Sequence, residues 1–283
     1  MNLRDLVADA EAQLKTSPHP ERARQDAETL LLHILCQNRA WLLANWDEET
    51  DPATQCTYRE LVSRRHTGEP IQYITGTTEF FGLPFSVGPG VLIPRPETEH
   101  LVEEVLRLAA PLSTPQIADI GTGSGIIAVA LANALPNARI TAIDYSPQAL
   151  AIARENAQRN QVADRIDFIE GDLLAPLTGQ QFDIIASNPP YIPTTDHDSL
   201  STEVRNHEPH TALFAGEDGL NIYRCLIPEA IPLLKPNGWL ALEIGYNQQP
   251  AIEQLLQSAG YQNIRFLPDY QDIPRVAVAR KDK

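Results

Sequence analysis

The sequence lacks a long apolar segment. Its longest apolar run, residues 126–135, is about half of the ~20 residues that a membrane-spanning helix needs. The N-terminus mixes acidic residues into its first turns and does not show the basic-then-apolar order of a signal peptide. We therefore expect no membrane span and a cytoplasmic location.

Cysteines are few and far apart. Cys36, Cys56 and Cys225 are odd in number and include no C-x-x-C pair, which argues against a disulfide framework or a cysteine zinc site. We expect reduced, buried thiols. The histidines also show no metal-ligand spacing, so no metal site is predicted.

Basic residues are outnumbered. The 22 Lys and Arg against 37 Asp and Glu give a net charge of −15. Proteins that grip a phosphate backbone need Lys and Arg to displace its counterions, so stable nucleic-acid binding is not expected. At 283 residues the chain is longer than the roughly 100–200 residues of an average domain, which predicts a large domain with a smaller one.

The first part of the chain has helical periodicity. Apolar residues recur at helical spacing over 3–14 and 23–35, on either side of a proline-containing breaker at 17–20. A third helix is predicted from Asp51-Pro52 to Arg65. The range 70–94 is rich in glycine, proline, aromatic and β-branched residues. We therefore predict a helical domain over 1–69, a β-hairpin linker over 70–94 and an α/β domain over 95–283.

The α/β domain alternates apolar strands with helices. This alternation indicates a seven-stranded, mostly parallel sheet covered on both faces, and the short turn at 270–273 makes the last strand antiparallel. The predicted strands cover 116–121, 138–144, 166–172, 182–188, 237–245, 264–269 and 274–280. The predicted helices cover 97–109, 124–135, 147–160, 219–234 and 248–259.

A glycine-rich turn follows the first strand of this sheet. Asp119 precedes it, and a helix begins directly after it. Such glycines allow a tight turn and a close approach to a ligand, and the next strand ends in Asp144, which can accept hydrogen bonds from ribose hydroxyls. A nucleoside-type ligand is therefore expected. The turn consists of Gly121, Thr122, Gly123, Ser124 and Gly125.

A second motif, Asn188-Pro189-Pro190-Tyr191, ends the fourth strand. The prolines stiffen the backbone and lack N–H donors, so their carbonyls are free to accept hydrogen bonds. Asn188 adds a side-chain acceptor and Tyr191 a flat aromatic face. Together they can hold a planar NH₂ group, and the plain alternative is a rigid strand-ending turn.

The glycine turn resembles the S-adenosyl-L-methionine loop of Rossmann-like class I methyltransferases. It does not fit the dinucleotide motif, whose third glycine would fall at Ile126. The resemblance implies that Asp119 lies near the methionine end, that Gly121 to Gly125 cradle the cofactor and that Asp144 holds the ribose. It further implies that Asp172 contacts the adenine amine and Leu173 its ring.

Further stretches resemble the HemK/PrmC family of protein-(glutamine-N5) methyltransferases. They are residues 68–83, 91–103, 203–224 and 242–248, and the resemblance covers essentially 60–281. It implies methylation of the glutamine in the Gly-Gly-Gln motif of peptide chain release factors, with Asn188, Pro189, Pro190 and Tyr191 as catalytic residues. Residues 1–69 would then recognise the substrate, and 95–283 would be catalytic. After the Glu-Pro pair in the stretch 203–224, the family often has Arg, whereas this chain has His210.

Two other functions remain open from the sequence. An adenine or cytosine amino-methyltransferase of DNA or RNA would use the same motif but needs a basic groove or a target-recognition domain. The second alternative is a non-catalytic cofactor-binding module. Loss of Asn188 would favour it, but Asn188 is present. Arg95, Glu97 and Glu99 either contact the cofactor or cap the following helix, and the capping role is favoured. The long connection 192–219 is expected to form a lid or substrate-binding rim.

Overall fold

The computed structural model describes residues 1–282, which pack as two compact units. The helical unit comprises residues 1–77 with 200–207, and the α/β unit comprises 78–199 with 208–282. The segment 200–207 thus joins the helical unit although it follows the acceptor motif in sequence. The boundaries after residues 69 and 94 stay a prediction.

The helical unit is built around one apolar core. Buried leucines and alanines of its first helices face one another, and the Tyr58 hydroxyl donates to the Ala27 carbonyl at 2.9 Å. The third predicted helix begins where expected, because the Asp51 side chain accepts from the backbone N–H of Ala53 and of Thr54. The helices are α1 (Leu3–Leu14), α2 (Ala23–Leu35), α3 (Arg39–Ala44), α4 (Pro52–His66), α5 (Ile71–Thr75) and α9 (Thr202–His207).

The start of the predicted linker is helical rather than extended. Residues 71–75 form α5, which begins after Pro70 and is capped at its C-terminus by Gly76 with φ 72°. Its Ile71 and Ile74 pack into the core of the helical unit, and this burial favours the helix over a β conformation. The hairpin itself consists of β1 (Thr77–Phe80) and β2 (Leu83–Ser86).

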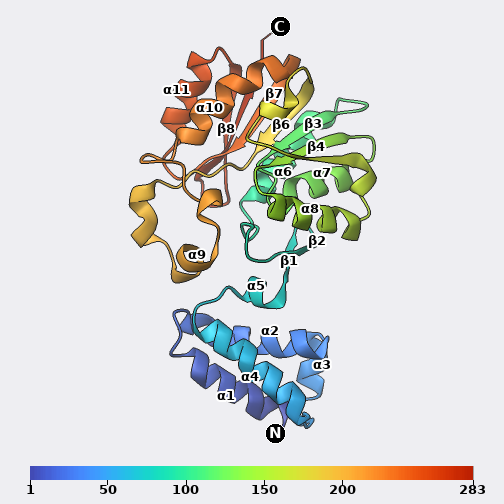
Figure 1. The fold of residues 1–283 in the computed structure, drawn as a ribbon, viewed down its shortest axis with the longest axis vertical. Helices are drawn as coiled ribbons and strands as arrows, with labels where there is room; N and C mark the ends of the chain where they lie inside the picture. Colours follow the sequence, from blue (N-terminus) through green and yellow to red (C-terminus); the bar gives the residue numbers. More distant parts are fainter. Residues whose placement is uncertain (283) are drawn as a thin grey trace. The chain divides into compact units, whose positions relative to one another are not determined.

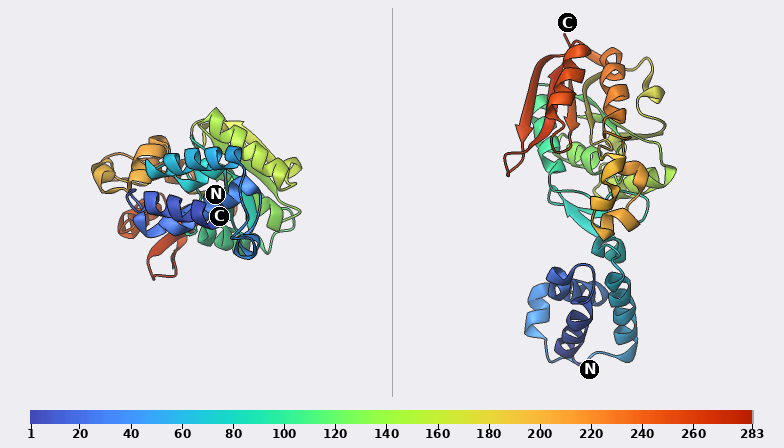
Figure 2. Two further views of the ribbon diagram at one scale, coloured as in Figure 1. Left: turned by 90° about the horizontal axis from the view of Figure 1, so that it is seen from below. Right: turned by 90° about the vertical axis from the view of Figure 1, so that its left-hand side faces the viewer.

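The α/β unit contains the predicted seven-stranded sheet. Its order is β5-β4-β3-β6-β7-β9-β8, and β9 is antiparallel to both of its neighbours while the remaining pairs are parallel. The hairpin of β8 and β9 (red in Figure 2) therefore forms one edge of the sheet. The strands are β3 (Gln116–Ile120), β4 (Arg139–Asp144), β5 (Ile166–Glu170), β6 (Phe182–Ser187), β7 (Leu234–Glu243), β8 (Gln262–Pro268) and β9 (Pro274–Arg280).

Helices cover both faces of this sheet (Figure 1). Alternate strand residues point to opposite faces, so that Ile117 packs into one core and Ala118 into the other. The first core contains α6 (Thr98–Ala109), α7 (Ile126–Ala134) and part of α8 (Pro147–Arg159), and the second contains α10 (Asn221–Ala230) and α11 (Gln249–Ser258). The sheet is thus buried on both sides, as its apolar strands predict.

One prediction about the thiols is wrong. Cys36, Cys56 and Cys225 are free, but all three are exposed. Cys56 and Cys225 lie on the outward faces of helices α4 and α10, and Cys36 ends α2 in a left-handed conformation.

No helix within residues 1–282 is long and apolar enough to cross a bilayer.

Candidate active site

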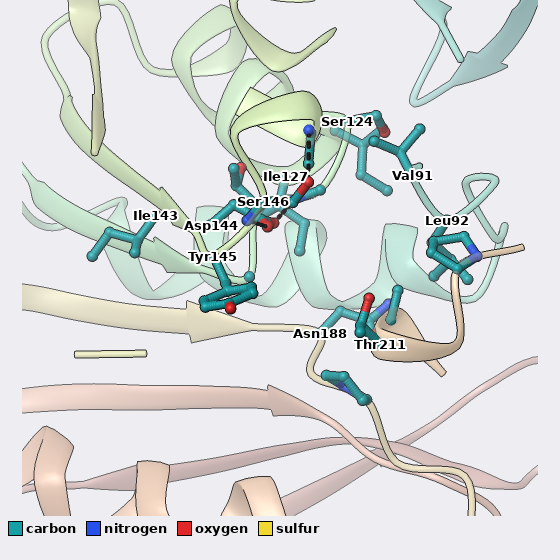
Figure 3. A pocket seen from close by; sticks show the side chains of 18 of the residues that line it. Val91, Leu92, Ser124, Ile127, Ile143, Asp144, Tyr145, Ser146, Asn188 and Thr211 are labelled. Carbon is teal, nitrogen blue, oxygen red and sulfur yellow. Dashed lines mark hydrogen bonds between the residues drawn. The ribbon is translucent and has the colours of Figure 1, made fainter. Parts of the chain in front are cut away.

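A cavity of about 270 Å³ lies at the carboxyl ends of β3, β4 and β6 (Figure 3). These strands are parallel, so the loops that follow them meet at one edge of the sheet. Most of the predicted site residues line this cavity. They are Gly121, Thr122, Gly123, Ser124, Asp144, Asp172, Leu173, Asn188 and Pro190. The other four, Asp119, Gly125, Pro189 and Tyr191, are not part of its lining.

The glycine turn has a backbone that only glycine adopts without strain. Gly121, Gly123 and Gly125 have φ values of 71°, 57° and 83°. A Cβ on Gly121 or Gly123 would meet no atom within 4 Å, so these two backbones face open space. A Cβ on Gly125 would lie 3.0 Å from the Cβ of Ala153 in α8. Gly125 therefore lets the turn pack against α8.

Asp144 ties the ends of β3 and β4 together. Its Oδ2 accepts from the Gly123 N–H at 2.7 Å, and its Oδ1 accepts from the Ser146 N–H at 2.9 Å. Ser146 caps α8 by accepting from the Ala149 N–H. A carboxylate offers about four acceptor sites, so Asp144 keeps capacity for a ligand's hydroxyls. Tyr145, which follows it, also lines the cavity and is largely exposed.

Asp119 lies beneath the glycine turn and is fully buried. Its Oδ2 accepts from the Thr122 hydroxyl at 2.6 Å and from the Ala128 N–H at 3.2 Å. Burial raises the pKa of this carboxyl to about 7, although both hydrogen bonds oppose the shift. Its Oδ1 is buried and has no hydrogen-bond partner among residues 1–282. Asp119 therefore supports the glycine turn from beneath and does not itself reach the cavity.

The acceptor motif is held from behind by a set of hydrogen bonds. The Ser187 hydroxyl donates to the Ile120 carbonyl at 2.7 Å, which joins the ends of β6 and β3. The Asn188 Nδ2 donates to the Thr98 Oγ1 at 3.0 Å. The Tyr191 hydroxyl donates to the Glu243 Oε1 at 3.4 Å, and burial raises the pKa of this phenol above its usual range. Figure 3 shows Asn188 and Asp144 at the same cavity.

Several residues of the site were not predicted from the sequence. Thr98 lines the cavity, and so does Arg95, which the sequence favoured as a helix-capping residue. The Arg95 guanidinium instead pairs with the buried Glu208 at 2.6 Å. Glu97 makes no capping hydrogen bond through its side chain, whereas Glu99 accepts from the Phe81 N–H.

The connection after the acceptor motif contributes to the cavity wall. Pro209, Thr211 and Ala212 line it, and they lie in the stretch 203–224 that carries the family resemblance. His210 does not line the cavity and contacts the rings of His197 and Phe214. Within residues 1–282, no three His, Cys, Asp or Glu side chains gather closely enough to hold a metal ion.

Comparisons with known proteins place this site in a family. A model of the PrmC N-terminal domain matches residues 5–76, and a model of the methyltransferase small domain matches residues 98–206. The release factor glutamine methyltransferase of Moorella thermoacetica is 45% identical over 99% of this chain and 98% of the relative. That of Koribacter versatilis is 42% identical over 99% of each chain.

A solved structure shows the same fold at low identity. The N-terminal domain of human METTL16 in complex with SAH is 19% identical, covers 72% of this chain and 77% of its own, and has a TM-score of 0.53. The α/β unit thus has the Rossmann-like methyltransferase fold. Because relatives above 40% identity match the chain over nearly its full length, it belongs to the release factor glutamine methyltransferase family.

Proposed function

We propose that this chain transfers a methyl group from S-adenosylmethionine to the side-chain amide nitrogen of the glutamine in the Gly-Gly-Gln motif of release factors. The observation that carries the proposal is one cavity lined by both a glycine turn and Asn188 of the acceptor motif. The full-length relatives support the same acceptor, since they are named release factor glutamine methyltransferases.

The residues present fit the cofactor. The open backbone of Gly121 and Gly123, with Thr122 and Ser124 between and after them, would cradle its methionine part. Asp119 would lie beneath the methionine end, where its charge would favour the ammonium group through the glycine turn, and Asp144 would accept from the ribose hydroxyls. When bound, the cofactor supplies an electrophilic methyl group on a sulfonium sulfur.

Asp172 and Leu173 complete the proposed cofactor site. Both line the cavity beyond the end of β5, where Asp172 would contact the adenine amine and Leu173 the ring. Leu173 has φ 46°, a left-handed backbone conformation that residues other than glycine seldom adopt. Gly125 supports this site indirectly, by letting the turn approach α8.

The acceptor side would activate the amide. An amide nitrogen is a weak nucleophile because its lone pair is delocalised into the carbonyl. Hydrogen bonds from the substrate NH₂ to the Asn188 Oδ1 and to the Pro189 carbonyl would favour pyramidal nitrogen and align it with the methyl group. Pro190 keeps this backbone extended, and Tyr191 would stack on the amide. The cofactor would give up its methyl group to this nitrogen and keep the electron pair of the former methyl–sulfur bond, and the substrate nitrogen would then release a proton to solvent.

The competing acceptor is the amino group of adenine or cytosine. It has the same planar geometry, but the net charge of −15 disfavours a polyphosphate substrate. A protein substrate places no such demand on the surface. Release factors act in the cytoplasm, so the same proposal places this enzyme there.

Methyl transfer in a mixture tests the proposal. The full chain is incubated with radiolabelled S-adenosylmethionine, purified release factor and nucleic acid, and the products are separated before counting. We expect label on the Gly-Gly-Gln peptide of the release factor. Label on nucleic acid alone would contradict the proposal.

A further inference from the structure

The proposed chemistry depends on which end of the Asn188 amide faces the acceptor. Only Oδ1 can accept a hydrogen from a substrate NH₂ group, whereas Nδ2 would oppose it donor to donor. The Asn188 side chain lines the cavity, so rotation of its amide by a half turn would exchange these two atoms. Something in the fold must therefore distinguish them.

Thr98 provides a partner for one end of the amide. It is the first residue of α6, its side chain is completely buried, and its Oγ1 accepts from the Asn188 Nδ2 at 3.0 Å. A hydroxyl can both donate and accept, so Thr98 alone would suit either orientation of the amide. Which orientation of the Asn188 amide Thr98 favours depends on the group to which the Thr98 hydroxyl donates its hydrogen.

Glu243 gives that hydrogen a destination. It ends β7, is 2% exposed, and its Oε1 accepts from the Tyr191 hydroxyl at 3.4 Å. The nearby Thr98 hydroxyl lowers the pKa of the Glu243 carboxyl, as a hydrogen-bond donor to it does. An ionised carboxylate only accepts hydrogen bonds. When Thr98 donates to Glu243, the lone pairs of its Oγ1 remain for Asn188, and they match Nδ2 rather than Oδ1.

We propose that Thr98 and Glu243 are positioning residues that hold the Asn188 amide with Nδ2 toward Thr98 and Oδ1 toward the acceptor. This inference rests on the proposed function and assigns two further residues that orient the acceptor motif. Glu243 also holds the Tyr191 hydroxyl, so one buried carboxyl orients the residues at both ends of the motif.

The charged groups around Glu243 make this arrangement sensitive to pH. Arg275 of β9 favours the carboxylate, whereas Glu97 before α6 opposes it, and the phenols of Tyr191 and Tyr223 also face it. Its Oε2 is buried without a hydrogen-bond partner among residues 1–282. Chiefly through burial, the pKa of Glu243 is raised to about 7. Protonated Glu243 can donate to Thr98, which would release the Thr98 hydrogen toward Asn188 and remove the selection.

Variants of the full chain in single-turnover methyl transfer to release factor test the inference. Thr98→Val keeps the shape but removes the hydroxyl, and it should slow transfer roughly 10- to 100-fold because the reacting groups lose their alignment. Thr98→Ser restores the hydroxyl and should recover most of that loss. Thr141→Val removes a buried hydroxyl from β4 and serves as the matched control. Calorimetric binding of S-adenosylmethionine reports whether each variant is folded.

The pH profile supplies a readout that loss of packing would not change. In the wild type, the transfer rate should rise with pH through about 7, since the ionised carboxylate is the active form. Glu243→Gln should remove this inflection and slow transfer at high pH. The pH profile of Glu243→Gln also tests the inference if Thr98→Val does not fold.

Three results would overturn the inference. They are an unchanged rate in Thr98→Val, equal losses in Thr98→Val and Thr98→Ser, and an unchanged inflection in Glu243→Gln. Failure of the proposed function is a separate outcome, because the wild type itself would then leave release factor unlabelled.

Discussion

The two sides of the cavity are built in different ways. On the cofactor side, each residue lies near the end of a strand or in the loop that follows it, and Asp144 reaches the glycine turn through one hydrogen bond. On the acceptor side, Asn188 depends on Thr98, which lies 90 positions earlier, and Tyr191 depends on Glu243, 52 positions later. A local motif can thus supply cofactor binding, whereas alignment of the acceptor needs the assembled sheet.

The largest effect is expected on the acceptor side. Asn188→Ala removes the side-chain acceptor for the substrate NH₂ and should lower single-turnover methyl transfer by about 100- to 1,000-fold. Cofactor affinity should change much less, which calorimetry would measure. Asn133→Ala, at an exposed position of α7, is the control. A normal rate in Asn188→Ala would remove Asn188 from the chemistry.

The cofactor side should show the opposite pattern. Asp144→Ala removes the acceptor for ribose and for the N–H groups of Gly123 and Ser146, so cofactor affinity should fall roughly 10- to 100-fold. The transfer rate at saturating cofactor should stay close to that of the wild type. Asp167→Ala changes an exposed acid on the neighbouring strand β5 and should alter neither value. If the saturated rate of Asp144→Ala collapses, the two sides are not separable.

A matched pair of glycines separates backbone strain from ligand binding. Gly123 and Gly260 have φ values of 57° and 89°, and a Cβ at either would meet no atom within 4 Å. Substitution by alanine should cost each about 1–2 kcal/mol of unfolding free energy. Only Gly123→Ala should also weaken cofactor binding, by roughly 10-fold. Equal cofactor affinity in both variants would argue against the glycine turn as a cofactor cradle.

The smallest expected effect concerns Asp119 and pH. Burial raises its folded-state pKa from 3.8 to about 7, so the protonated form is favoured in the folded protein. Its contribution to stability is full below about pH 4 and is lost as pH rises through about 7. Asp119→Asn removes this titration. Its unfolding free energy relative to the wild type should therefore increase by at least about 1 kcal/mol between about pH 5 and pH 8.

Denaturant unfolding at both pH values would measure this difference. The same variant should bind S-adenosylmethionine more weakly, because its neutral amide attracts the ammonium group less than a carboxylate does. A stability difference independent of pH would show that Asp119 does not titrate with a raised pKa.

Local patterns predicted most of the fold. The seven strands follow from apolar runs, and α4 follows from Asp51 and Pro52. Helices α3 and α5 were missed because they have only 6 and 5 residues, too few to show a helical period. For α5, burial of Ile71 and Ile74 outweighs the β-branched composition of the segment.

In the site, too, local motifs predict some residues, whereas residues that depend on contacts distant in sequence are not predicted. Asn188 and Asp144 belong to motifs that end strands, and their place at the cavity follows from strand order. Glu243 lies in the stretch 242–248 that carries the family resemblance, but the sequence assigns it no role, because its burial and its proximity to Thr98, Tyr191 and Arg275 exist only in the folded sheet. For Arg95 the local sequence favours a capping role, because its partner Glu208 lies 113 positions away and becomes a neighbour only in the fold.

The central claim is that the acceptor is the planar amide of one glutamine. Its most direct test is tandem mass spectrometry of release factor after reaction with the full chain and S-adenosylmethionine. The wild-type factor is compared with a variant whose Gly-Gly-Gln glutamine is glutamate. We predict the mass of one methyl group on that glutamine and none on the glutamate variant. Equal methylation of the glutamate variant, or a methyl group at another residue of the factor, would contradict the claim.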